Sequence, residues 1–142
     1  MNLRLALACL AASLAFAAPA FAEETQALLP DSVNLELIEG STVPEDCQYP
    51  ETISDTATFE LACVTMPRAS SGYIAAEYIG QLGEHGWVQG DYVTGGLTAV
   101  RTDEQDCRHV LNIFPSDFPR GDRRSANVVI WFALEREPRC TN

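Results

Sequence analysis

Lysine is absent from this sequence: all nine basic residues are arginines, and they face 20 aspartates and glutamates. Histidine is scarce too, with two in the whole chain. The formal net charge of −11 repels nucleic acid and anionic lipid surfaces at long range. We therefore expect no nucleic-acid partner and no electrostatic attachment to a membrane.

Long apolar runs are missing outside the N-terminus. There, Leu5 to Ala18 follows a positive charge at Arg4, and an Ala-Phe-Ala cleavage site ends at Ala22. This run is shorter than the roughly 20 residues needed to cross a bilayer, and a lipid-modified Cys9 would need a longer apolar stretch before it. We predict that residues 1–22 are a cleaved secretory signal peptide, that no segment spans the membrane, and that the protein is periplasmic or secreted.

The rest of the chain suffices for one domain. Residues 23–32 show little apolar periodicity and are predicted to be a mobile leader, followed by a single domain over 33–142. Loss of the signal peptide leaves eight arginines against 20 acidic residues, a net charge of −12. Residues 107–142 contain six arginines and four acidic residues, so the C-terminal part of the chain is less acidic than the part before it.

Cysteine usage indicates disulfides, not a metal site. The mature chain keeps four cysteines, Cys47, Cys63, Cys107 and Cys140, and an even number in an exported chain indicates two bridges with three compatible pairings. No Cys-x-x-Cys pair is present, which disfavours zinc. We favour Cys47–Cys63, which would attach a loop to a strand, and Cys107–Cys140, which would join the same end of two paired strands. We expect no metal and no cofactor.

Apolar periodicity predicts the secondary structure. A period of two predicts strands, and apolar residues 74, 75, 78, 79 and 82 predict an amphipathic helix that starts near Ser70 or Ser71. The predicted strands are 33–39, 58–66, 87–93, 97–102, 108–114 and 127–135. The result is a small two-layer α+β domain, with a mainly antiparallel sheet of about five to six strands and one helix packed on one face.

The stretch QLGEHGW predicts how the helix ends. With Gly86 in the left-handed conformation, His85 becomes the C-cap, and Trp87 falls where it packs on Leu82. His85 then has a structural role. A catalytic role for it would need an acid or a nucleophile nearby, and the spacing signals neither.

Two further clusters are candidates for binding. Arg120, Arg123 and Arg124 lie in a polar loop predicted over 115–126, where forked guanidinium contacts would hold an anion or an acidic partner. The simpler alternative is a solvated loop that offsets the acidic body. The acidic turn Thr102–Asp106 could bind calcium, but it lacks the ligand spacing of a dedicated site, which favours a solvated turn.

The helix that ends in Gly-Trp and leads into a hairpin, over Tyr73–Trp87 and Val88–Gly96, resembles small uncharacterised exported proteins of proteobacteria. It is also similar to helix-on-sheet domains of envelope lipoproteins. The resemblance covers about Tyr73 to Glu135, concerns the fold, and carries over no functional residues.

Two classes of function remain open at this point. The absence of catalytic motifs favours a non-catalytic exported binding or accessory protein of the bacterial cell envelope, presenting the sheet or the arginine loop to an envelope protein or a small ligand. The alternative is a small hydrolase-like periplasmic enzyme that uses His85 or His109. The enzyme would need a histidine beside an acid or a hydroxyl within a cavity.

Overall fold

The computed structural model describes residues 26–51, 53–117 and 125–141. These residues contain one α-helix, α1 (Ser71–Glu84), preceded by a 3-10 turn, η1 (Arg68–Ser70). The strands are β1 (Ala27–Leu28), β2 (Leu35–Glu36), β3 (Phe59–Pro67), β4 (Val88–Val93), β5 (Gly96–Thr102), β6 (Cys107–Asp117), β7 (Asn127–Glu135) and β8 (Arg139–Cys140).

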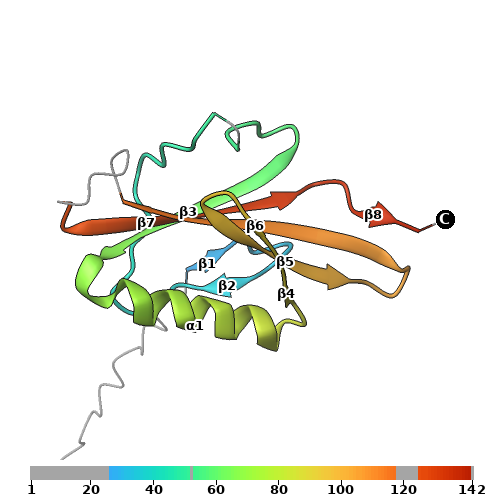
Figure 1. Cartoon of the computed structure of the whole chain (residues 1–142), viewed down its shortest axis with the longest axis horizontal. Coiled ribbons are helices and arrows are strands. Elements are labelled where there is room, and N and C mark those ends of the chain that lie inside the picture. The colour runs from blue at the N-terminus through green and yellow to red at the C-terminus, as the bar shows by residue number, and fades with distance from the viewer. Residues whose placement is uncertain (1–25, 52, 118–124, 142) are drawn as a thin grey trace, which may run out of the picture.

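A six-stranded antiparallel sheet forms the body of the molecule. Its order is β3-β7-β6-β5-β4, and β8 pairs with the start of β6. β1 and β2 form a separate two-stranded sheet. Figure 1 shows α1 running along one face of the large sheet, with β1 and β2 beside it. The predicted α+β class, with one helix on a mainly antiparallel sheet, is confirmed.

The core on the helix side is built around one stripe of α1. Ile74, Tyr78 and Leu82 are buried at positions i, i+4 and i+8, and the Tyr78 ring meets the edge of Phe132 on β7 at a centroid distance of 5.4 Å. Ile79, expected in this stripe, is 47% exposed. The stripe is narrower than predicted because α1 contacts the sheet along one line.

The opposite face of the sheet is covered by the loop that precedes β3. Ile53, Tyr49 and Cys47 of this loop pack against Val129, Trp131 and Ala133 of β7 and against the outer face of β3. The predicted disulfide Cys47–Cys63 attaches the loop to β3. This second cover explains why seven consecutive residues of β7, 128–134, are buried.

The helix ends as predicted. Gly86 has a φ of 77°, the Trp87 N–H donates to the Leu82 carbonyl at 2.9 Å, and the Gly86 N–H donates to Gly83 at 3.1 Å. Leu82 and Trp87 are both buried. These paired bonds and the apolar contact form a Schellman motif, with His85 as the C-cap.

The β4–β5 hairpin contains two adjacent glycines with different roles. Gly95 has a positive φ of 82°, whereas Gly96 does not and is already part of β5. A side chain at Gly96 would collide with the carbonyl oxygen of Ile113 on β6. One glycine therefore serves the turn, and the other allows two strands to approach closely.

Two predictions for the N-terminal region are wrong. Residues 26–32 are packed rather than mobile: they contain β1, and Leu28 and Leu29 are each 4% exposed. The strand predicted at 33–39 is limited to β2, because a turn returns the chain at Leu29, whose carbonyl accepts three N–H donors, and residues 38–41 turn again. The signal peptide predicted for residues 1–22 lies outside the described residues.

Candidate functional site

The predicted arginine site lies outside the described residues, since Arg120, Arg123 and Arg124 all fall within 118–124. It therefore stays a prediction. The loop boundary predicted at residue 115 is wrong, because β6 continues to Asp117. Pro115 is tolerated there because β5 pairs with β6 only as far as Ile113, so one edge of β6 needs no N–H donor beyond that point.

His85 is exposed at the end of α1. Its backbone N–H bonds back to Gln81 and Leu82, as the last donor of the helix. Its position supports the structural role that the sequence predicted for it.

His109 on β6 is paired with a carboxylate. Its Nε2 donates to Asp103 Oδ2 at 2.9 Å, and the two side chains are 23% and 27% exposed. Asp103 Oδ1 accepts the backbone N–H groups of Gln105 and Cys107, both at 2.9 Å. The hydrogen bond from His109, followed by the one from Cys107, lowers the pKa of Asp103 below its ordinary value.

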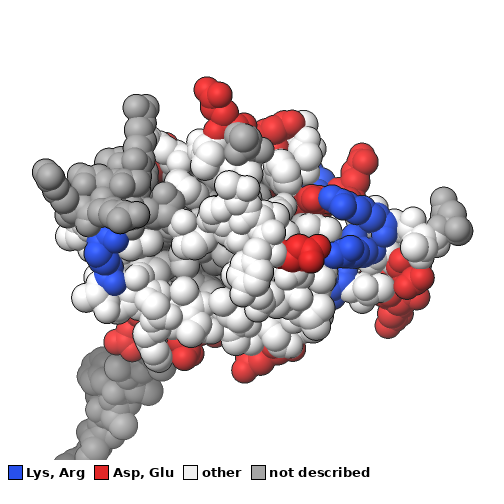
Figure 2. All heavy atoms as spheres, viewed as in Figure 1, with Lys and Arg blue, Asp and Glu red and all other residues white. Residues whose placement is uncertain are grey.

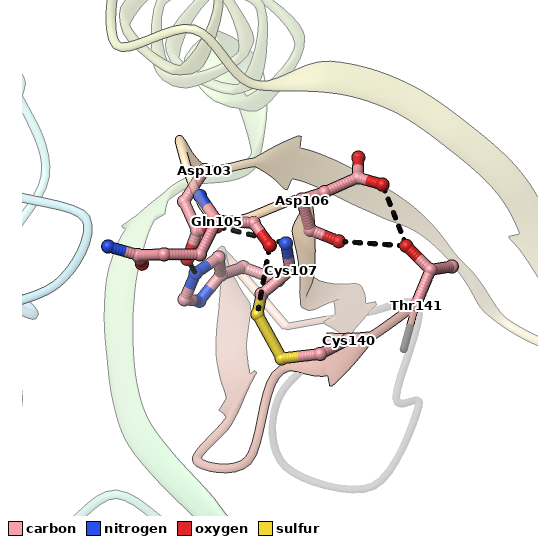
Figure 3. The surroundings of a disulfide bond; sticks show 7 residues. Asp103, Gln105, Asp106, Cys107, Cys140 and Thr141 are labelled. Atoms are coloured by element: carbon pink, nitrogen blue, oxygen red, sulfur yellow. Dashed lines mark hydrogen bonds and ion pairs between the residues drawn. A yellow bond between two sulfur atoms is a disulfide. The ribbon is translucent and has the colours of Figure 1, made fainter.

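The acidic turn before β6 uses its carboxylates internally. Besides the bonds of Asp103, Asp106 accepts the Thr141 hydroxyl at 2.7 Å on Oδ2, next to the Cys107–Cys140 disulfide (Figure 3). Across residues 26–51, 53–117 and 125–141, no three or more histidine, cysteine or acidic side chains are grouped so as to hold a metal ion. The turn is a structural connection between the start of β6 and the C-terminus.

Arg101 on β5 stacks on Trp87 at the end of α1. The guanidinium of Arg101 on β5 lies 4.9 Å from the centre of the Trp87 ring, and it also donates to the Ser32 carbonyl at 3.4 Å. Arg101 is thus held against the helix end and the turn before β2. The guanidinium of Arg101 covers the Trp87 ring at the edge of the core, which leaves Arg101 less available for a ligand.

A groove of about 530 Å³ runs between α1 and the segment that follows β2. Its floor is apolar, with Leu37, Ile38 and Ile74, and its rim carries three exposed carboxylates, Glu36, Glu39 and Glu77. Tyr73, 66% exposed, and Gln81 also line it, together with Gly40 and Ser70. Figure 2 shows acidic side chains along the side of the molecule where α1 lies. No arginine lines the groove among the described residues, so its field favours cations.

Side chains of α1 hold the groove in shape. The Gln81 amide accepts the Glu36 N–H at 2.8 Å and donates to the Glu36 carbonyl at 3.2 Å, as a neighbouring strand would. The buried Tyr78 hydroxyl accepts the Ile38 N–H at 3.3 Å and bonds to the Ser41 hydroxyl at 2.8 Å. The wall formed by residues 36–41 is therefore fixed without a ligand, which lowers the entropic cost of binding one.

The sequence reasoning missed this groove. Its three glutamates come from segments about 40 residues apart, and a chain with 20 acidic residues offers no reason to select them. One signal was present: Tyr73, Glu77 and Gln81 follow at i, i+4 and i+8, a polar stripe directly beside the buried one.

Two other cavities are present in the described part of the chain. One, of about 540 Å³, lies between residues 57–59 and residues 135–139. The other, of about 170 Å³, is apolar and lies between α1 and β4, with Ile79, Trp87 and Val88 among its lining. Neither histidine lines any of the three cavities. His109 therefore has the carboxylate partner that the hydrolase alternative requires, and it lines none of these three cavities.

In the described residues, no helix has the length and apolar composition that crossing a bilayer requires. Comparison of the chain with protein-family models, with curated proteins and with solved structures finds no match.

Proposed function

We propose that this protein is an exported, non-catalytic binding or accessory protein of the bacterial cell envelope, and that its binding surface is the groove between α1 and residues 36–40. Two disulfides support an oxidising compartment, and the N-terminal pattern of residues 1–22 supports export. The observation that carries the proposal is the groove, with its acidic rim, apolar floor and fixed wall.

The lining selects a cationic segment of a partner protein. Arginine and lysine side chains combine an aliphatic stem with a charged end. The stem would lie over Leu37 and Ile38, and the charge would reach Glu39 or Glu77 at the rim. The exposed ring of Tyr73 offers a further surface for a guanidinium. A volume of about 530 Å³ accommodates a few side chains of an extended peptide.

The proposal is tested with a charge-matched pair of variants. The groove variant combines Glu36→Gln, Glu39→Gln and Glu77→Gln, and the control combines Glu51→Gln, Glu84→Gln and Glu104→Gln. All six side chains belong to exposed residues, and the control three do not line the groove. Fluorescence anisotropy would measure the binding of a labelled nine-residue peptide in which arginine alternates with leucine.

We expect the groove variant to bind about tenfold more weakly than the parent, which corresponds to roughly 0.5 kcal/mol for each of three partly solvated ion pairs. The control has the same net charge and should stay within about twofold. Equal weakening of both variants would reduce the binding to long-range attraction by an acidic protein, and unchanged affinity of the groove variant would remove the groove as the site.

The hydrolase alternative rests on the hydrogen bond between His109 and Asp103. In the described part of the chain no serine or threonine hydroxyl is bonded to His109, and the carboxylate already accepts two backbone N–H groups. The pair therefore acts as a turn-forming contact at the start of β6. A hydrolytic activity that His109→Leu abolishes while the folded fraction stays unchanged would favour the alternative.

A further inference from the structure

The C-terminal residues continue the course of β7 along β6, after an interruption. β6 pairs Leu111 with Leu134, and further on it pairs Arg108 with Arg139. An unbroken antiparallel ladder would place Glu137 opposite Arg108. Two extra residues are thus looped out between β7 and β8, and this bulge separates the end of the chain from the body of the sheet.

Arg136 is the last residue of the C-terminal segment that is hydrogen-bonded to the start of β3. Its N–H donates to the Thr58 carbonyl at 3.0 Å, and its Nε donates to Thr56 at 2.9 Å and Phe59 at 3.2 Å. Residues 137–141, which we call the strap, are all exposed. Arg136 therefore anchors the chain to the start of β3, and the strap begins directly after it.

Few contacts hold the strap. β8 pairs with two residues of β6, and Thr141 bonds to Asp106. Arg139 pairs with Glu135, the last residue of β7, which is only four residues earlier in the chain. Among the described residues, the covalent connection of the strap is the disulfide Cys107–Cys140. Without that bond, a two-residue ladder at the end of a sheet is weak enough to fray.

The two disulfides differ in access. Cys63 is 2% exposed, and its partner Cys47, which is half-buried, lies in the loop that packs on the sheet. Cys140, in contrast, is an exposed residue of the strap, while Cys107 is buried. Since thiol–disulfide exchange needs an approach to one sulfur along the bond, the strap disulfide, with its exposed Cys140, is the more accessible of the two.

We propose that Cys107–Cys140 is a site of thiol–disulfide exchange with a dithiol of the cell envelope, and that its reduction releases the strap. A thiolate of the dithiol attacks Cys140 Sγ, the Cys107–Cys140 bond breaks, and Cys107 leaves as a thiolate that takes up a proton. The second thiol of the dithiol then displaces Cys140 from the mixed disulfide. The protein gains two electrons and two protons, and the dithiol becomes a disulfide.

Release of the strap changes a cavity. Glu137, Pro138 and Arg139 form one side of the cavity of about 540 Å³, and residues 57–59 form the other. Opening the strap removes that side and the pairing of β8 with β6, while strands β3 to β7, α1 and the groove keep their other contacts, since none of the strap residues belongs to either core cluster. The exchange site is therefore independent of the binding groove.

The experiment uses the whole oxidised protein and dithiothreitol as the dithiol. Samples reduced under native conditions would be acid-quenched and alkylated, and the four cysteines would be quantified by peptide mass spectrometry, with circular dichroism recorded alongside. We expect Cys107 and Cys140 to be labelled at least about tenfold faster than Cys47 and Cys63, because their bond is more accessible. The circular dichroism spectrum should be retained while they are labelled.

Three results would overturn the proposal. The two disulfides could be reduced at the same rate, Cys47–Cys63 could be reduced first, or labelling of Cys107 and Cys140 could coincide with loss of the fold. The double variant Cys107→Ser with Cys140→Ser supplies an independent check: it should be folded and should show faster hydrogen exchange in residues 137–141. Unchanged exchange there would mean that the disulfide does not hold the strap.

Discussion

The loop before β3 and the strap after β7 are each attached by one disulfide, yet they relate to the core in opposite ways. The loop brings Ile53 and Tyr49 onto the second face of the sheet, so its disulfide secures a layer of the core. The strap consists of exposed residues beyond Arg136, so its disulfide secures a peripheral segment. The loop is therefore held by its disulfide and by packing against the core. The strap is held mainly by its disulfide.

This difference bears on stability in a way that loop length alone does not. The chain-entropy model gives about 3 kcal/mol for a separation of 16 residues and about 4 kcal/mol for 33. That model assumes an unchanged native state. Where the native segment frays after release, the native state gains freedom too, and the loss of stability is smaller. The shorter loop should therefore matter at least as much as the longer one.

The largest effect is expected for removal of the loop disulfide. Cys47→Ala with Cys63→Ala should lower the free energy of unfolding by about 3 kcal/mol or more, because packing keeps the loop ordered and the full chain-entropy term is lost. Urea denaturation of the variant and the parent would measure this. A loss below about 1 kcal/mol would show that the loop layer does not depend on its covalent tie.

Removal of the strap disulfide should cost less. Cys107→Ser with Cys140→Ser is expected to lower the free energy of unfolding by about 2 kcal/mol, short of the chain-entropy limit, because the strap frays in the folded variant. The same denaturation series measures it. A loss of about 4 kcal/mol, larger than the loss caused by removing Cys47–Cys63, would mean that the number of residues between the cysteines determines how much each disulfide stabilises the protein.

Packing of the loop is tested by a smaller change. Ile53→Val removes one methylene from a side chain that is 4% exposed and should cost about 1 kcal/mol. Val43→Ala, at a 37% exposed residue of the same segment, removes two carbon atoms and is the surface control; it should still cost less than about 0.5 kcal/mol. Equal effects in thermal denaturation would mean that Ile53 is not anchoring the loop.

The smallest expected effects on stability come from two aspartates in turns. Asp55 lies in the loop before β3, and Asp103 lies in the turn before β6, where the strap is attached. The Thr58 hydroxyl and then the Ala57 N–H lower the pKa of Asp55, and His109 and then the Cys107 N–H lower the pKa of Asp103. Because each pKa is lower in the folded than in the unfolded protein, the stabilisation is present above the unfolded value and disappears as the pH falls through the folded one.

His109→Leu separates the two aspartates. It should raise the pKa of Asp103 toward its ordinary value, because the largest cause of the shift is removed, and leave Asp55 unchanged. Carboxyl chemical shifts followed by nuclear magnetic resonance between pH 2 and 6 would report both values. An unshifted Asp103 would mean that the backbone N–H donors alone set its pKa.

Local sequence signals predicted much of the fold. Apolar residues predicted the strand at 127–135, and Gly86 with Trp87 predicted the helix end, because both patterns act within a few residues. The strand predicted at 58–66 also contains Cys63, and Cys63 lies on the face that the loop covers. Both favoured disulfide pairings are present in the structure.

The features that escaped prediction depend on contacts between distant segments. β1 and β2 are two-residue strands, and burial of Leu28 and Leu35 in the core holds them in place. Tertiary packing therefore outweighs the weak local periodicity of these segments. The groove needs Glu36 and Glu77 side by side, which the Gln81 amide secures through the β2 backbone. No pattern within a single segment shows either arrangement.

The contrast between loop and strap is tested most directly by hydrogen–deuterium exchange on protein in which only Cys107–Cys140 has been reduced and alkylated. Compared with the oxidised protein, exchange should accelerate in residues 137–141 and at the start of β6, and it should stay unchanged in α1, in β3 and in the loop over residues 43–57. Acceleration that spreads through β7 into α1 and that loop would contradict the account, because the strap disulfide would then be securing the core.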